Sequence, residues 1–233
     1  MRSRRHSRLT ALICAVGASF SLLTGCAAAP AADAPPRWVP QSALPGALLS
    51  AGDIDAMMTT TGMTAHPAVA QMADHRNLLP NLNCLGVWQV NEAPIYDPSD
   101  WQSVRQQMLR TPDSDSWDTL VVQSVVLYRS AEAAQRFFTE SADRWGKCTN
   151  HRVNIRLNDQ PLPAWRSGDL TATDSRLTMP YVRGRGPQTR SCERALAVAA
   201  NVILDVQACK PQQPADVTQA GEIADRIVTR LPR

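Results

Sequence analysis

The stretch Cys192–Cys209, CERALAVAANVILDVQAC, decides the fold of this chain. Two apolar segments flank Ala200-Asn201, and asparagine tolerates the positive φ that a two-residue hairpin turn requires. With this turn Cys192 faces Cys209 at a non-hydrogen-bonded position, where Cα atoms lie about 4.5 Å apart and a disulfide can form. We therefore predict a hairpin closed by that disulfide. Its apolar row, on the face opposite the sulfur atoms, comprises Ala195, Ala197, Ala199, Val202, Leu204 and Val206.

The first 26 residues have the three-part architecture of a bacterial lipoprotein leader. Arginines within residues 1–8 precede a mostly apolar stretch that is shorter than the roughly 20 residues of a membrane-spanning helix. Leu23-Thr24-Gly25-Cys26 then forms a lipobox. We expect cleavage before Cys26, acylation of its sulfur, and attachment to the outer face of the cell membrane through the acyl chains. An uncleaved anchor and an ordinary signal peptide are the alternatives, and Arg4-Arg5 leaves Sec and twin-arginine export both open.

The sequence divides into a leader (1–25), a lipidated Ala/Pro-rich tether (26–45) and one folded domain (46–233). The last part is long enough for a hydrophobic core of its own. The formal charge of +3 depends on four arginines in the leader, which has no acidic residue, so the mature chain is slightly negative. We therefore expect no nucleic-acid partner, because such binding needs a basic face.

Four cysteines remain for the folded domain, and an even number in an exported protein predicts two disulfides. With Cys192 and Cys209 paired, elimination leaves Cys84 and Cys148 for the second bond. A zinc site is the alternative, because Cys148 and His151 have the spacing of metal ligands. The sequence has no second pair of ligands at such spacing.

Hydrophobic periodicity and turn residues give the order of elements. Helices are predicted over 48–63 with Ser50 as N-cap, over 130–145, and over 217–231. Strands are predicted over 84–90, 120–128, 151–157, 164–173 and 176–183, in addition to the hairpin; 101–109 fits either a short helix or an edge strand. Consecutive strands joined by short turns favour an α+β fold, an antiparallel β-sheet with helices packed on one face and two disulfides.

With these elements placed, residues 48–231 resemble the PknH-type extracellular sensor domain, which is found in actinobacterial receptor kinases and in stand-alone lipoproteins. The resemblance implies an antiparallel sheet flanked by helices, the two disulfides as paired above, and an open cleft for a ligand. It supplies no catalytic residues, and this chain has no kinase domain. The residues that carry it are Cys84, Trp145, Cys148, Cys192, Arg194, Ala195, Asn201, Val202, Asp205, Val206, Cys209, Ile223, Ala224 and Ile227.

Residues that could carry chemistry are few, and the usual hydrolase, nucleotide and phosphate motifs are missing from the sequence. We expect no catalysis, no cofactor and no metal. Arg183, Arg185 and Arg190 could grip an anionic ligand or form a solvated basic loop. Asp205 could line a cleft, or it could pair with Arg194 or Arg226. His66, His75 and His151 are interpreted as solvated or capping residues, and the six tryptophans as dispersed packing residues.

The hypothesis that follows is a lipid-anchored extracytoplasmic binding or sensor-like module that holds a small molecule or cell-envelope component in a cleft. The alternative is a protein–protein adaptor at the envelope that modulates a receptor kinase or another partner without catalysis. A deep apolar cleft would favour a ligand, and a flat surface would favour a protein.

Overall fold

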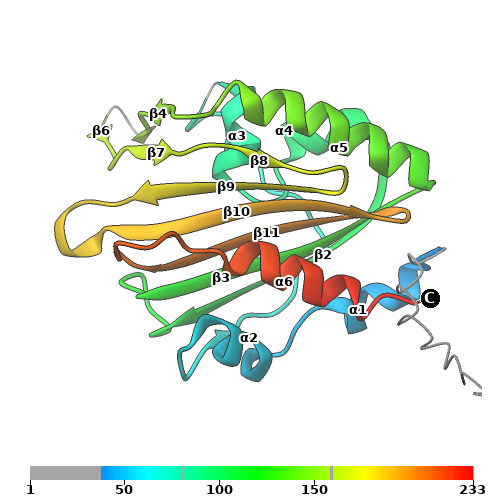
Figure 1. Ribbon diagram of the computed structural model, residues 1–233, viewed down its shortest axis with the longest axis horizontal. Coiled ribbons are helices and arrows are strands. Elements are labelled where there is room, and N and C mark those ends of the chain that lie inside the picture. Colours follow the sequence, from blue (N-terminus) through cyan, green and yellow to red (C-terminus); the bar gives the residue numbers. More distant parts are fainter. Residues whose placement is uncertain (1–37, 80, 158–159, 233) are drawn as a thin grey trace, which may run out of the picture. The chain divides into compact units, whose positions relative to one another are not determined.

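The computed structural model describes residues 38–79, 81–157 and 160–232, and these form a helix-flanked antiparallel sheet (Figure 1). The predicted leader, Cys26 and most of the predicted tether lie outside the described residues. Within the described ranges, no helix is both long and apolar enough to span a bilayer.

The main sheet has nine strands in the order β1-β2-β3-β11-β10-β9-β7-β4, with β8 paired to β9, and all of its pairs are antiparallel. A small hairpin of β5 and β6 stands apart from it. The strands are β1 (Thr64–Ala65), β2 (Trp101–Thr111), β3 (Thr119–Tyr128), β4 (Arg152–Val153), β5 (Arg156–Leu157), β6 (Gln160–Pro161), β7 (Trp165–Ser167), β8 (Thr171–Ala172), β9 (Arg176–Arg183), β10 (Arg190–Ala199) and β11 (Val202–Pro211).

The central hairpin of β10 and β11 has the predicted register. Cys192 pairs with Cys209, and their Cα atoms lie 4.0 Å apart in a disulfide. The turn differs from the prediction in one respect, because the positive φ of 50° falls on Ala200. Asn201 is buried instead, and its side chain bonds both the N–H and the carbonyl of Val39. The asparagine thus fixes the start of the domain rather than the geometry of the turn.

The main helices are α1 (Leu44–Ala47), α2 (Ala51–Met58), α3 (Leu82–Trp88), α4 (Ala93–Tyr96), α5 (Ala131–Gly146) and α6 (Gln219–Val228). Ser50 caps α2 as predicted, through a reciprocal contact with Asp53, but the helix ends at Met58 because Thr59 adopts a left-handed conformation. The predicted helix 130–145 is confirmed as α5, and 217–231 contains the shorter α6. Residues 101–109 belong to strand β2.

The prediction of a strand over 84–90 was wrong, because this segment forms helix α3. Asn81 caps its first turn by accepting from the backbone of Asn83. A short apolar run is ambiguous between a strand and a buried helix. Here Cys84, Leu85 and Trp88 share one buried side at helical spacing. Cys84 bonds to Cys148 beyond the end of α5, as predicted, with 5.5 Å between Cα atoms.

Helices cover both faces of the sheet, which corrects the expectation that they pack on one. Helix α6 lies across β10 and β11 (Figure 1), packing against the face that carries Ala195 and Val206. Helices α3, α4 and α5 pack on the opposite face, which carries Leu196 and Ile203. Both sets of side chains on β10 and β11 are apolar enough to need cover, so the central strands are buried on two sides.

The α+β class, the antiparallel sheet and both disulfides are confirmed. Four short strands, β4, β5, β7 and β8, replace the longer strands predicted over 151–157 and 164–173, and they leave this edge of the sheet irregular. The irregular edge is where the candidate functional site is found.

Candidate functional site

Tryptophans that are dispersed in the sequence gather at the β7 edge, which corrects their interpretation as separate packing residues. Trp88 and Trp165 meet edge to face with ring centroids 5.0 Å apart. Trp165 in turn stacks on Tyr181, with centroids 4.8 Å apart and planes within 6° of parallel. Trp117, from the β2–β3 connection, is half-buried and also contacts Arg183.

Arg183 lies between two of these indoles. Its guanidinium carbon is 4.3 Å from the centroid of the Trp165 ring and 5.5 Å from that of Trp117, so both contacts are cation–π interactions. Within the described residues, the guanidinium of Arg183 has neither a carboxylate partner nor a hydrogen-bond acceptor. Burial, reinforced by the like charge of Arg190, holds the pKa of Arg183 below its usual range.

Arg190 has a different role, because it is buried and bonded on every side. Its guanidinium donates to the carbonyls of Trp117, Pro187 and Thr189 and pairs with Asp118 at 3.0 Å. These contacts hold the segment that carries Trp117 in place. Arg190 is therefore a positioning residue, and of the three predicted arginines it is the one whose donors are already used.

Around Arg183 the structure has a cavity of about 390 Å³, a size typical of small-molecule sites. Its surface is mostly apolar, and the Nε1–H of Trp88 in its wall is buried without a hydrogen-bond partner among the described residues. The wall also includes Asp115, which faces solvent and pairs with Arg110 at 3.4 Å. The cavity is lined by Trp88, Asp115, Ser116, Trp117, Ile155, Leu162, Pro163, Trp165, Arg183, Gly184, Gln188 and Arg190.

A second hollow, also of about 390 Å³, adjoins this cavity and shares Pro163, Trp165 and Gly184 with it. Three arginines line it, Arg152, Arg166 and Arg185, and none of the described residues in its lining is acidic. The predicted basic loop is thus divided: Arg183 faces the aromatic cavity, Arg185 faces the neighbouring hollow, and Arg190 is structural.

Exposed apolar side chains surround the same edge. Leu157, Leu162 and Val182 keep 45%, 37% and 40% of their surface accessible. Leu162 belongs to the wall of the aromatic cavity and Val182 to that of the basic hollow. Clustered exposed apolar residues with polar neighbours mark interaction sites more often than single ones do.

A buried polar network positions the helix that supplies Trp88. Arg194 is fully buried and pairs with Asp205 at 2.5 Å, which confirms the Arg194 alternative for Asp205. Its guanidinium also donates to the carbonyls of Gly86, Val87 and Gln89 at the end of α3. A cation at a helix C-terminus satisfies carbonyls that have no partner within the helix. Arg194 thereby fixes Trp88 relative to the sheet.

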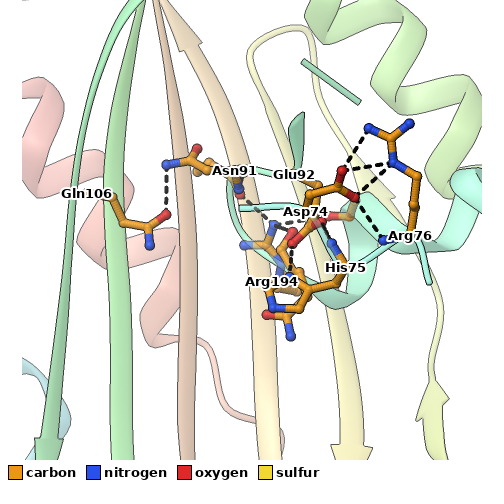
Figure 2. A network of polar contacts seen from close by, with 10 residues as sticks. Asp74, His75, Arg76, Asn91, Glu92, Gln106 and Arg194 are labelled. Carbon is orange, nitrogen blue, oxygen red and sulfur yellow. Dashed lines mark hydrogen bonds and ion pairs between the residues drawn. The ribbon is translucent and has the colours of Figure 1, made fainter. Parts of the chain in front are cut away.

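The network continues through Asn91 and Glu92, which follow α3 (Figure 2). The backbone N–H of Asn91 and the hydroxyl of Tyr96 both donate to Asp205, at 3.0 and 2.9 Å. Burial and the nearby Asp205 raise the pKa of Tyr96 well above its usual value, so the phenol remains protonated as a donor. Glu92 is fully buried, and its carboxylate forms hydrogen bonds with both the backbone N–H and the ring Nδ1 of His75.

The interpretation of the histidines as solvated or capping residues fits the exposed His151, whereas His66 and His75 each contact a carboxylate. His75 binds Glu92, and His66 lies 2.9 Å from Asp113 near the surface. The zinc alternative for Cys148 and His151 is wrong, because Cys148 is in a disulfide. Among the described residues, no cluster of three or more histidine, cysteine or acidic side chains could hold a metal ion.

A larger hollow of about 640 Å³ lies between α5 and the turn of the central hairpin. It is open, has no aromatic residue in its lining, and takes most of its wall from the solvent-facing side of α5, including Glu132, Arg136 and Glu140. The aromatic cavity is smaller, but it is less open and its wall has aromatic rings and the guanidinium of Arg183, so it is the better candidate site.

The fold and this cavity define a disulfide-bonded α+β domain with a cavity of ligand size at one edge of its sheet. The sequence pattern of the PknH-like extracellular domain matches residues 39–230, and the chain belongs to that family. The crystal structure of the extracellular domain of PknH from Mycobacterium tuberculosis is similar, with a TM-score of 0.73 and 26% identity. The match covers 82% of this chain and 96% of that one.

The curated relatives are serine/threonine-protein kinases. PknH of Mycobacterium bovis is 27% identical over 197 residues, and PknJ of the same organism is 22% identical over 198 residues; each match covers 84% of this chain. The chain spans about a third of the length of these kinases. The similarity is to the extracellular domain, so it does not indicate catalysis by this chain.

Proposed function

We propose that this protein is a lipid-anchored extracytoplasmic module. It binds a small molecule or a cell-envelope component in the aromatic cavity, whose wall includes Trp117 and Trp165. The observation that carries the proposal is Arg183 held between two indoles in the wall of a 390 Å³ cavity. Ligand sites are mostly apolar and have a few polar groups that fix the orientation of the bound molecule. Membership of an extracellular sensor-type family supports a binding role.

Ligand screening by thermal shift tests the proposal directly. A library of envelope lipids, glycans and metabolites is expected to contain compounds that raise the melting temperature, because binding to the folded state alone stabilises it. Trp117→Ala, which removes a half-buried wall of the cavity, is expected to abolish that shift. Trp38→Ala is the matched control, since Trp38 is exposed and lies outside the cavity lining.

Two results would contradict the proposal. One is a library without any stabilising compound, and the other is a shift that Trp117→Ala leaves intact while the variant remains folded. In the second case the ligand would bind elsewhere, and the hollow beside α5 would be the next place to test.

A protein–protein adaptor is the second candidate, and the exposed Leu157, Leu162 and Val182 favour it. Crosslinking in cells separates the two roles. An adaptor would lose its crosslinked partner in a Leu157→Asp variant but retain it in Trp117→Ala. A ligand-binding module would show the opposite dependence in the thermal-shift assay.

A further inference from the structure

Among the described residues, none supplies a counter-charge to the guanidinium of Arg183, and this bears on the kind of ligand that the cavity would take. Ring contacts hold its plane in place, but a ring face accepts none of its five N–H donors in a strong hydrogen bond. Arg190, its nearest like charge, is neutralised by Asp118, whereas Arg183 has no such carboxylate within the described residues. A desolvated cation of this kind gains most from an anion that enters the cavity.

The carboxylate and amide side chains of the described wall are directed to other partners. The carboxylate of Asp115 points into solvent and pairs with Arg110, and the side-chain oxygen of Gln188 is used by Arg190. A planar guanidinium is also the geometry that best matches a carboxylate or a phosphate, through two parallel hydrogen bonds.

The apolar part of the wall calls for a second feature in the ligand. The apolar residues Ile155, Leu162 and Pro163 also line the cavity. Leu162 is partly exposed to solvent. Next to them, Arg152, Arg166 and Arg185 give the adjoining hollow a positive field. Such a field attracts anions to the edge and raises the rate of their association.

We infer that the cavity binds an anionic amphiphile, whose acidic group pairs with Arg183 and whose apolar body packs on Trp117, Trp165 and Leu162. This inference rests on the proposed function and specifies the chemical class of its ligand. The acidic group is a carboxylate or a phosphate ester, and the apolar body is an alkyl chain.

The test compares dodecyl phosphate with dodecanol and with inorganic phosphate, each titrated below any micelle concentration and followed by tryptophan fluorescence and calorimetry. Dodecyl phosphate is expected to bind at least tenfold more tightly than either of the others, and its affinity is expected to fall with salt. Arg183→Gln should weaken dodecyl phosphate about ten- to hundredfold, as expected for a charge-assisted hydrogen bond. The same variant should leave dodecanol unchanged.

Two control variants separate charge from fold. Arg136→Gln removes one positive charge from the exposed side of α5, outside the aromatic cavity, and is expected to change neither affinity by more than twofold. Arg183→Lys retains the charge but loses the planar fork, and it is expected to recover only part of the affinity. Dodecanol binding by each variant reports that its cavity remains intact.

The inference is overturned if dodecanol binds as well as dodecyl phosphate, if inorganic phosphate alone binds as well, or if Arg183→Gln leaves the preference unchanged. The inference is also overturned if the protein binds none of the three compounds. The proposed function is judged separately, by the library screen and Trp117→Ala. If the library screen finds a neutral ligand, the binding role stands and the anionic class of ligand is rejected.

Discussion

A single residue, Glu193, makes the free energy of unfolding depend on pH. It is buried on β10, and the backbone N–H of Gly221 in the first turn of α6 donates to it at 3.0 Å. Desolvation raises its pKa from 4.5 to about 7, and the hydrogen bonds from α6 only partly oppose that rise. Between these values the folded protein retains a proton that the unfolded chain releases. The free energy of unfolding therefore falls as pH rises from about 4.5 to 7.

Glu193→Gln is expected to remove most of that fall, because the amide can still accept from Gly221 but does not titrate. At pH 8 the variant should be more stable than the parent by up to about 3 kcal/mol, at 1.36 kcal/mol for each unit of pKa shift. Urea denaturation from pH 4 to 8 measures the difference. Glu140→Gln, on the exposed side of α5, is the control. Parallel pH profiles for parent and Glu193→Gln would contradict the prediction.

Arg194 is the residue whose loss should cost most. Arg194→Met would leave Asp205 as an uncompensated buried charge and the last carbonyls of α3 without donors. Removing one partner of a buried pair typically costs about 3–5 kcal/mol. Chemical denaturation should show this loss, with Arg226→Met as the exposed control. Adding Asp205→Asn should cost less than the two single changes would suggest, and full additivity would argue against coupling.

The turn of the central hairpin carries backbone strain at the scale of an element. Ala200 has φ of 50°, a left-handed conformation that costs a non-glycine residue about 1–2 kcal/mol. Ala200→Gly is expected to raise the free energy of unfolding by about 0.5–1 kcal/mol, after allowing for the greater entropy of glycine in the unfolded chain. Ala199→Gly, one residue earlier in extended strand, should lower it. Thermal unfolding of both variants checks the opposite signs.

The two disulfides connect elements over different spans and should contribute unequally. Cys84 and Cys148 are 64 residues apart, and Cys192 and Cys209 are 17 apart. Chain entropy predicts about 4 kcal/mol for the first bond and about 3 kcal/mol for the second. Replacing each pair with alanine and comparing denaturation midpoints tests the order. A larger loss for the hairpin pair would show that chain entropy does not dominate here.

Elements with strong periodicity were predictable from the sequence, and short buried runs were not. The alternation around Ala200 gave the register of β10 and β11, and the spacing of apolar residues in 130–145 gave α5. The run from Cys84 to Val90 was too short to separate a strand from a helix, and Arg194, 105 residues from Gln89, supplies the cap that ends α3. Caps provided by distant side chains leave no local signal.

The site was harder to predict than the fold, because it depends on side chains from four separate segments. Arg183 was a candidate from its place in a basic loop. Trp88, Trp117 and Trp165 gave no signal, since they are far apart in sequence and meet only when β7 pairs with β9. The second helical layer was not predictable in the same way. The alternation in β10 and β11 predicts one apolar face toward the core, whereas the opposite face is also covered by helices.

At the scale of the whole molecule, lipidation of Cys26 remains a prediction with a direct test. Mass spectrometry of the membrane fraction is expected to find a mature N-terminus at Cys26 that carries a diacylglycerol. A Cys26→Ser variant should lose the modification and leave the membrane fraction, because acyl chains are the predicted attachment. Cys14→Ser is the control within the leader and should change neither. An unmodified N-terminus in the parent would reject the anchor.

The hydrogen bonds between Asn201 and Val39 also fix where the chain enters the domain. It secures the start of the domain beside the Ala200 turn, at one end of β10, while Arg190 at the other end borders the aromatic cavity. Ten residues of extended strand separate the two points by about 30 Å. The point where the chain enters the described domain and the aromatic cavity therefore lie at opposite ends of β10, so whatever precedes Val39 joins the domain away from the cavity.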